Sequence, residues 1–364
     1  MRVWKLKTFW IALTIGALIA AGELAVRTRA YLRSGSWSVT GDDLFVDDPV
    51  LGRVPRAKTQ QGGAASSITI NSLGFRGAEF PTTKPAGTYR VFCVGDSVLF
   101  GAKLAREEQV VTSQLQKHLA AMTGRTVHVI NAAVPGYTIS SAAAAYEHRA
   151  RPLSPDMLVV VQVVNDLKAA LRTAFGDARA AAASDDAPGL NPAYRLAKFR
   201  DENFLLYHLT RKNLTPLVTP LGAGVDCHDT VPDDLAAGYS RDLAALGRQA
   251  RADGVQVAVC TARRAFSPEQ PLSEQKANAA GLLLIVPNVS LEGMHAAFAA
   301  FDRAVRDVAA AEGAILADMA RRVPADAALF EDPTHLNAEG HALAGRILAE
   351  LLAPHVPAEG QGGV

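Results

Sequence analysis

Short apolar runs alternate with longer segments of helical periodicity from residue 89 to residue 352. Such alternation is typical of a doubly wound α/β fold, in which helices connect the parallel strands of one sheet. The run at 157–164 is the most continuously apolar, as expected of a central parallel strand. The sequence predicts strands over 89–94, 126–130, 157–164, 255–260 and 314–316, and helices over 107–122, 138–150, 233–252, 290–312 and 338–352. We therefore expect an α/β protein with a parallel sheet of five strands.

Three other segments interrupt or flank this alternation. Residues 35–88 are rich in Gly, Pro, Asp and Ser, with one strand-like stretch at Ser67–Ile70, and we expect a connecting region packed on the core. Residues 176–232 mix Ala-rich, Asp-Pro-Gly-rich and aromatic pieces, which indicates an insertion after the third strand. We expect this insertion to lie over the carboxyl edge of the sheet, where it would either shape substrate access or be a surface loop without a role in binding. The main domain then covers 89–355, and the Gly-rich residues 356–364 form a tail that we expect to be disordered.

The N-terminal segment, residues 1–34, contains a long apolar stretch. Phe9–Gly22 is apolar except for Thr14, and three basic residues precede it. Its 14 residues would extend about 21 Å as a helix, short of the ~30 Å hydrocarbon core, so a cleaved signal peptide is one interpretation. The helical pattern continues toward Leu32, which favours an uncleaved membrane anchor over residues 8–26 and a juxtamembrane helix. Both interpretations place the main domain on the periplasmic or extracytoplasmic side, whereas a buried helix of a soluble protein is the third alternative.

The charge balance and the cysteine count argue against several classes of function. The chain has 37 basic and 36 acidic side chains, so no basic surface for nucleic acid is expected. Of the three cysteines, Cys93 and Cys260 fall in predicted strands and Cys227 falls in an irregular segment. This pattern favours small buried apolar side chains over a disulfide framework or a metal cluster. We expect no cofactor and no metal ion.

A candidate nucleophile follows the first predicted strand of the sheet. The apolar run Tyr89–Val94 is broken by Gly95-Asp96-Ser97. In an open parallel sheet, ligands bind beyond the carboxyl ends of the strands, where the chain turns toward a helix. A hydroxyl there, beside helix N-terminal amides, is well placed to attack a substrate. The alternative is an ordinary turn in which Asp96 or Ser97 caps the helix.

A candidate base and its orienting carboxylate precede the last predicted helix. A serine hydroxyl becomes a good nucleophile when a base takes its proton, and the base works best when a carboxylate orients it. The segment Asp332-Pro333-Thr334-His335 supplies both groups in one turn. Because this loop can return to the carboxyl edge of the sheet, His335 is expected to face Ser97. The alternative is a capping Asp332 and a surface His335.

Two further residues follow strand ends and offer hydrogen-bond donors to a developing oxyanion. Gly136 lies in the loop after the second strand and presents an unobstructed backbone amide. Asn165 follows the third apolar run and presents a side-chain amide. Each alone is an unremarkable loop residue. Three successive strands that end in Ser97, Gly136 and Asn165 are difficult to explain by turn chemistry alone.

These motifs, in this order, resemble those of the SGNH hydrolases, also called the GDSL esterase and lipase family. Gly95-Asp96-Ser97 resembles the nucleophile block, Gly136 the glycine of the second block, Asn165-Asp166 the asparagine block, and Asp332-x-x-His335 the final block. The resemblance extends over about residues 89–352. The four blocks together are far more specific than any one of them.

The resemblance implies roles for these residues and an order for the strands. Ser97, Asp332 and His335 would form a catalytic triad. The Ser97 N–H, the Gly136 N–H and the Asn165 side chain would form the oxyanion hole. The family's fold implies a five-stranded parallel sheet in flavodoxin-like order.

The chain also departs from the family pattern. Val163 and Val164 stand before Asn165, where the family usually has a glycine, and this difference would alter the shape of the acyl pocket. Val98 follows Ser97, where leucine is common. The segment Ile70–Gly77 is similar to the lead-in of membrane-anchored bacterial members. No Gly-x-Ser-x-Gly elbow is present, which argues against an α/β-hydrolase.

The function expected from these motifs is that of a serine esterase, which cleaves carboxylic esters through an acyl-serine intermediate. Small acyl groups on an envelope glycan, or a lipid-like ester, are the expected substrates. Two alternative functions are also consistent with these motifs. An O-acyltransferase would pass the acyl group to a sugar hydroxyl, and a catalytically silent protein would bind envelope polysaccharide.

Overall fold

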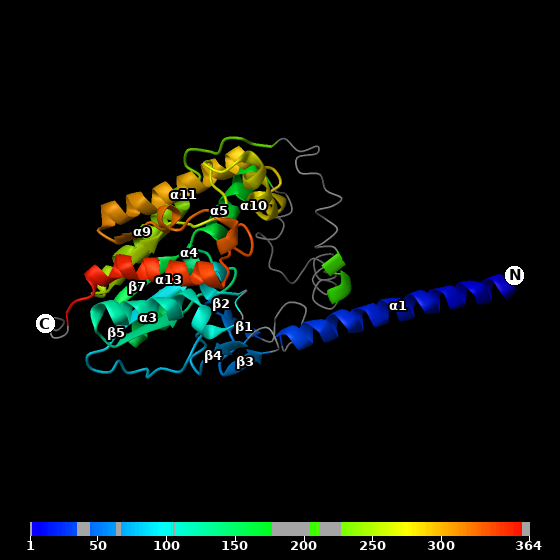
Figure 1. Ribbon diagram of the computed structural model, residues 1–364, viewed down its shortest axis with the longest axis horizontal. Helices are drawn as coiled ribbons and strands as arrows, with labels where there is room; N and C mark the ends of the chain where they lie inside the picture. The colour runs from blue at the N-terminus through cyan, green and yellow to red at the C-terminus, as the bar shows by residue number, and fades with distance from the viewer. Residues whose placement is uncertain are drawn as a thin grey trace.

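The computed structural model describes residues 2–34, 44–62, 67–102, 104, 106–176, 204–207, 209–210 and 227–358. Its centre is a sheet of five strands in the order β6-β5-β7-β8-β9, and every adjacent pair is parallel (Figure 1). In chain order these strands are β5 (Tyr89–Gly95), β6 (Val127–Asn131), β7 (Met157–Val161), β8 (Gln256–Cys260) and β9 (Ile315–Ala317). The first strand of this sheet therefore lies between the second and the third. The expected α/β fold with flavodoxin-like strand order is confirmed.

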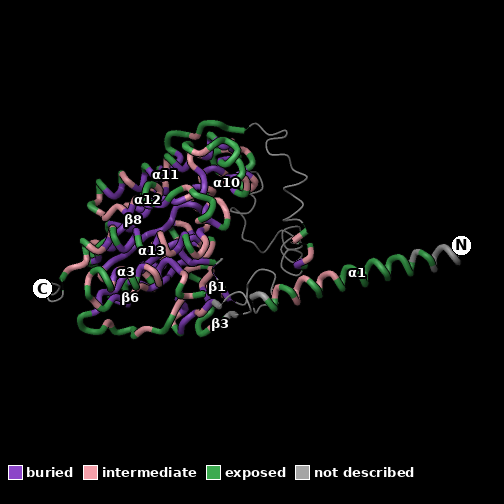
Figure 2. The backbone as a smooth tube through the Cα atoms, in the orientation of Figure 1, coloured by how far each residue is buried: buried purple, intermediate pink, exposed green. Residues whose placement is uncertain are grey.

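Helices cover both faces of the sheet, and the alternation of strand side chains explains how. In β5, Phe92 and Val94 point to one apolar layer, whereas Val91 and Cys93 point to the other. The first layer contains α4 (Ile139–Ala145), α5 (Val164–Phe175), α9 (Ala237–Ala252), α10 (Leu272–Ile285) and α11 (Leu291–Glu312). The second contains α3 (Val111–Thr123) and α13 (Ala338–Leu352). Figure 2 shows the strands as the buried centre between these helices.

Several predicted boundaries were wrong. The third strand ends at Val161, and α5 begins at Val164, because the apolar run continues through a buried strand end into a buried helix start. The segment expected to be helical from 107 begins with a single 3₁₀ turn, after which α3 starts at Val111. A π-helical turn, Tyr146–Ala150, extends α4. The helices α5 and α10 were not predicted.

The connecting region contains more regular structure than the sequence indicated. β1 (Phe45–Asp48) pairs with β2 (Gly52–Pro55), and β3 (Thr59–Gly62) pairs with β4 (Ser67–Ile70), each pair being antiparallel. Only β4 was anticipated. After β4, the buried Arg76 forms an ion pair with Glu107 at 3.1 Å and so fixes this region to the main domain.

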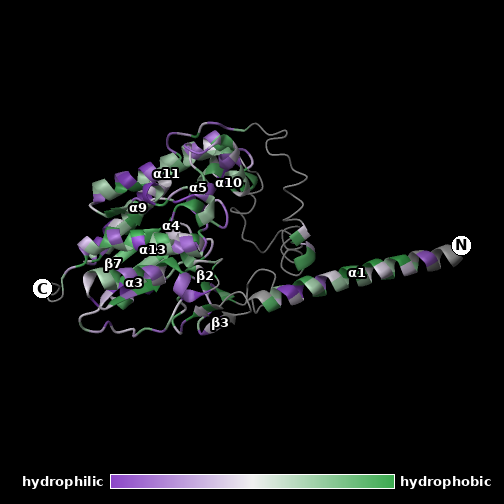
Figure 3. Ribbon diagram, in the orientation of Figure 1, coloured by the Kyte–Doolittle hydropathy of each residue, from purple (hydrophilic) through white to green (hydrophobic). Residues whose placement is uncertain are grey.

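The N-terminal helix α1 (Arg2–Ser34) extends away from the sheet (Figure 1). Its segment Phe9–Leu32, 24 residues, is long and apolar enough to cross a membrane by length and composition. The helix continues beyond Gly22, as the helical pattern toward Leu32 predicted. Figure 3 shows apolar residues along most of this helix, and their side chains are exposed. Most of the expected insertion, 176–232, and most of the tail, 356–364, lie outside the described residues.

Candidate active site

The turn between β5 and α2 (Ser97–Phe100) presents Ser97 at the carboxyl edge of the sheet. β5 ends at Gly95, where a Cβ atom would overlap the carbonyl oxygen of Val161 on the neighbouring strand, so only glycine fits there. Asp96 caps α2 by accepting a hydrogen bond of 2.9 Å from the Val98 N–H. The capping alternative is therefore correct for Asp96. Ser97 is the first residue of the helix, and its side chain is half-buried.

The structure brings His335 and Asp332 to this serine across 238 positions of sequence. His335 Nε2 lies 2.8 Å from Ser97 Oγ. On the other side of the ring, His335 Nδ1 lies 2.9 Å from both carboxylate oxygens of Asp332. Asp332 Oδ1 also accepts a hydrogen bond of 2.9 Å from the backbone N–H of His335, which holds the turn closed. Hydroxyl, imidazole and carboxylate thus form one hydrogen-bonded chain, the arrangement by which a base removes the proton of a serine.

Gly136 lies in the loop after β6, and Asn165 lies in the first turn of α5, which follows β7. β6 and β7 flank β5, and the Val134 N–H donates to the Gly95 carbonyl, which fixes the loop after β6 beside the turn that carries Ser97. Gly136 has φ +94°, a conformation that favours glycine, and no described residue accepts a hydrogen bond from its N–H. Asn165 Nδ2 donates one hydrogen bond of 3.0 Å to the Tyr137 carbonyl, which leaves its second N–H for a ligand.

A polar network that the sequence analysis missed holds these two loops together. Gln162 Nε2 donates to the Tyr137 carbonyl and to Asp166 Oδ2, both at 2.8 Å. Asp166 in turn accepts the Ile139 N–H at 3.0 Å, at the start of α4. The sequence feature that could have indicated this network is the group of polar residues after the third strand, Gln162 and Asn165-Asp166. The network fixes the distance between the two loops that carry Gly136 and Asn165.

Buried charges surround the hydrogen-bonded chain. Burial raises the pKa of the Asp96 carboxyl, although its hydrogen bond from the Val98 N–H and nearby positive charges act in the opposite direction. Burial also lowers the pKa of Lys168, one turn after Asn165 on α5, while the charges of Asp96 and Asp332 raise it. Lys168 is therefore a positive charge that interacts with Asp96 and Asp332, and the sequence analysis did not anticipate it.

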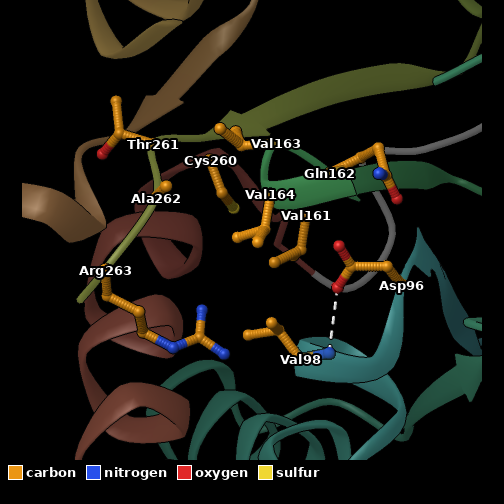
Figure 4. A pocket seen from close by; sticks show the side chains of 10 residues that line it. All are labelled: Asp96, Val98, Val161, Gln162, Val163, Val164, Cys260, Thr261, Ala262 and Arg263. Atoms are coloured by element: carbon orange, nitrogen blue, oxygen red, sulfur yellow. Dashed lines mark hydrogen bonds between the residues drawn. The ribbon is translucent and has the colours of Figure 1, made fainter. Parts of the chain in front are cut away.

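A small cavity of about 20 Å³ adjoins the turn that carries Ser97 (Figure 4). Its walls come from the ends of β5, β7 and β8 and from the residues that follow them. The lining residues are Asp96, Val98, Val161, Gln162, Val163, Val164, Cys260, Thr261, Ala262 and Arg263. A cavity of this size admits only a small group. Within the described residues, no group of three or more His, Cys, Asp or Glu side chains is placed to hold a metal ion.

The chain is similar in sequence to one protein family, and it is also similar to several solved structures. A family model described as GDSL-like Lipase/Acylhydrolase family matches residues 93–343. No curated protein matches the sequence. Among solved structures, TesA is 17% identical over 73% of this chain and 99% of that chain, with a TM-score of 0.43. The lipase/acylhydrolase from Enterococcus faecalis is 15% identical over 74% and 97%, with a TM-score of 0.44. A variant of an acetyl xylan esterase from Geobacillus stearothermophilus is 13% identical over 75% and 97%, with a TM-score of 0.43.

Proposed function

The chain belongs to the GDSL-like lipase/acylhydrolase family, and we propose that it hydrolyses carboxylic esters through an acyl intermediate on Ser97. The observation that carries this proposal is the hydrogen-bonded chain from Ser97 Oγ through His335 to Asp332. His335 Nε2 would take the hydroxyl proton as Ser97 attacks the ester carbonyl. Asp332 would hold the imidazole orientation and stabilise the positive charge that develops on it.

Donors that follow the ends of β5, β6 and β7 would stabilise the oxyanion of the tetrahedral intermediate. The Ser97 N–H, the Gly136 N–H and the free Asn165 N–H are the three candidates. Collapse of the intermediate would transfer the proton from His335 to the leaving alcohol and leave the acyl group on Ser97 Oγ. A water molecule, deprotonated by His335, would then release the acid and restore the serine.

The small cavity beside Ser97 supports a short acyl group rather than a fatty chain. About 20 Å³ admits only a small group, whereas drug-sized ligands occupy pockets of roughly 300–1,000 Å³. Together with an N-terminal helix that fits a membrane anchor or a signal sequence, this favours small acyl groups on an envelope glycan or a lipid-like ester. We place the catalytic domain on the periplasmic side, tethered by α1. Digestion of a membrane-bound form by protease added to spheroplasts tests this placement, and full protection would contradict it.

Hydrolysis of aryl esters by the full chain in detergent tests the proposed reaction. Aryl acetate should be cleaved faster than a long-chain aryl ester, and Ser97→Ala should cleave neither. A parallel reaction with added oligosaccharide detects acyl transfer. Release of free acid alone supports the hydrolase, and acylated oligosaccharide supports the O-acyltransferase that uses the same three residues. A folded protein without either reaction would support a silent polysaccharide-binding role.

A further inference from the structure

Arg263 is a buried cation that the proposed chemistry does not use. It lies in the segment after β8, and only 4% of the residue is exposed. Figure 4 shows its side chain extending into the cavity beside Ser97. Burial lowers the pKa of its guanidinium, which reflects the cost of keeping this charge away from water.

The cavity into which Arg263 points is part of the substrate-binding end of the molecule. Asp96 and Val98, which line it, are the two neighbours of Ser97 in the chain. Val163 and Val164, which line the opposite wall, lead directly to Asn165. The cavity therefore adjoins both the turn that carries Ser97 and the start of the helix that carries Asn165.

One edge of the Arg263 guanidinium has no partner. Its Nε and Nη2 atoms are buried, and no described residue accepts a hydrogen bond from either. These two nitrogens direct parallel N–H bonds from the same edge of the plane, which is the edge that binds two oxygens of a carboxylate. Leaving both donors unpaired in a buried site is costly, so an acceptor is expected there.

Two other arginines of the main domain, Arg264 and Arg306, have the carboxylate partner that Arg263 lacks among the described residues. The next residue, Arg264, pairs with Asp302 at 2.9 Å, and Arg306 pairs with Asp318 at 2.9 Å. The acidic side chain in the cavity of Arg263 is Asp96, whose Oδ1 accepts the Val98 N–H instead (Figure 4). The other polar side chains on the walls are Gln162 and Thr261, and Arg263 donates a hydrogen bond to neither of them.

We propose that Arg263 forms an anion subsite that binds a carboxylate carried by the ester substrate, with Nε and Nη2 each donating to one carboxylate oxygen. This inference rests on the proposed function, because it assigns the subsite to the ester attacked by Ser97. The carboxylate has two possible sources: the far end of a short dicarboxylic acyl group, or a uronic acid on the alcohol side. Lys168 on α5 adds a second positive charge near the site.

Matched esters with and without a carboxylate test the subsite in the full-length protein. On the acyl side, the mono-4-nitrophenyl ester of succinic acid is compared with 4-nitrophenyl acetate. On the alcohol side, O-acetyl glucuronic acid is compared with O-acetyl glucose. We expect kcat/KM to be roughly 10- to 100-fold higher for the charged member of at least one pair, the size of effect typical of hydrogen bonds between charged groups. The pair that shows the preference identifies the source of the carboxylate.

Substitutions at Arg263 connect this preference to the guanidinium. Arg263→Gln should lower the charged-to-neutral ratio of kcat/KM by the same roughly 10- to 100-fold. Arg263→Lys keeps the charge but loses the two-donor edge, so it should restore only part of the ratio. The matched control is Arg303→Gln, an exposed arginine on α11, which should leave the ratio unchanged. A ratio near one in the wild type for both pairs, or an unaltered ratio in Arg263→Gln, would overturn the subsite.

Two further measurements keep this test independent of the esterase proposal and of variant stability. If no ester is cleaved, the esterase proposal fails, and calorimetry of succinate and glucuronate binding to Ser97→Ala then tests the subsite alone. Binding that Arg263→Gln abolishes supports it, and no binding overturns it. If Arg263→Gln does not fold, inhibition of the wild type by succinate is compared with inhibition by uncharged succinamide. Equal inhibition by the two compounds overturns the subsite, and stronger inhibition by succinate supports it.

Discussion

Each end of the central sheet contains a buried arginine, and the two arginines differ in how many of their nitrogens have a hydrogen-bond partner among the described residues. At the amino end, Arg90 in β5 is fully buried, but its Nη1 and Nη2 atoms donate to the carbonyls of Pro81, Thr82 and Leu153. Only its Nε lacks a partner among the described residues. Asp156, which precedes β7, accepts the Arg90 backbone N–H at 2.7 Å. The polar groups at this end are largely satisfied by the protein itself.

At the carboxyl end, several donors are left without protein partners. Arg263 has two unpaired nitrogens, and the Gly136 N–H has no acceptor among the described residues. Ligands bind at the carboxyl ends of strands in folds of this type. We infer from this difference that the internal hydrogen bonds at the amino end stabilise the fold, whereas the unpaired donors at the carboxyl end bind the substrate. Substitutions at the two ends should therefore affect different properties.

The largest effect is expected for the nucleophile. Ser97→Ala should lower kcat by at least about 10⁴-fold, because no other side chain replaces the attacking oxygen. The melting temperature should change little, because the half-buried hydroxyl contributes little packing. Kinetics of aryl acetate hydrolysis and thermal unfolding measure the two properties. The matched control is Ser273→Ala, an exposed serine on α10, and near-normal activity of a folded Ser97→Ala protein would refute the triad.

Much of the fold follows from patterns that a single sequence contains. The five strands of the main sheet were found because buried parallel strands are short, apolar and bounded by polar turns. The ends of elements were less predictable. Val163 and Val164 continue an apolar run, yet Val164 starts a helix, because both a strand end and the first turn of α5 are buried here. α10 was missed because its apolar residues are not confined to one face, as the exposed Leu272 and Ile285 show.

The candidate site was predicted to the extent that its residues lie in short motifs. Ser97, Asp332 and His335 were each recognised because another residue of the same short motif stands next to them in the sequence. The structure brings the three side chains within hydrogen-bonding distance. Arg263 carries no such signal, since it is one arginine among many in a loop. Its significance depends on burial and on missing partners, which are properties of the packed chain and not of local sequence. Asp166 was visible only as the neighbour of Asn165, and its bond to the Ile139 N–H depends on tertiary structure.

The second prediction tests a donor at the carboxyl end. Asn165→Ala should lower kcat by roughly 10²–10³-fold with little change in KM, because its free N–H would act mainly on the oxyanion. The matched control is Asn288→Ala, since Asn288 is also half-buried and donates Nδ2 to a backbone carbonyl, that of Phe175. That variant should keep its activity. A change confined to KM in Asn165→Ala would instead assign the side chain to substrate positioning.

The third prediction tests the amino end. Arg90→Met should lower the free energy of unfolding by about 2–4 kcal/mol, because three carbonyls lose their donors in a buried site. The activity per folded molecule should not change. Denaturant unfolding measures the first property and titrated active-site kinetics the second. Arg125→Met is the control, because Arg125 also donates to two carbonyls, at 2.9 and 3.2 Å, but is only half-buried and should cost less. A loss of kcat without a loss of stability would contradict the division between the two ends.

The smallest effect is expected for His341, a buried group near the carboxyl end that has an internal partner. Its Nδ1 accepts the Val111 N–H at 3.1 Å between α13 and α3, and only 2% of the residue is exposed. Burial lowers the pKa of this imidazole well below its ordinary value, and the positive charges of Arg263 and Arg76 lower it further. His341 should therefore behave like the satisfied groups of the amino end and contribute to stability alone.

The pH dependence of unfolding measures this contribution. An unfolded histidine titrates near pH 6.5, so below that pH the unfolded chain binds a proton that folded His341 does not. The free energy of unfolding should then fall with decreasing pH, and this one group should remove about 2 kcal/mol between pH 7 and pH 5. Between pH 7 and pH 5 the free energy of unfolding of His341→Gln should fall by about 2 kcal/mol less than that of the wild type. His355→Gln, at an exposed position, should show the same decrease as the wild type. Equal pH dependence of the wild type and His341→Gln would show that His341 takes up its proton without unfolding, and the contrast between the two ends would then not extend to this residue.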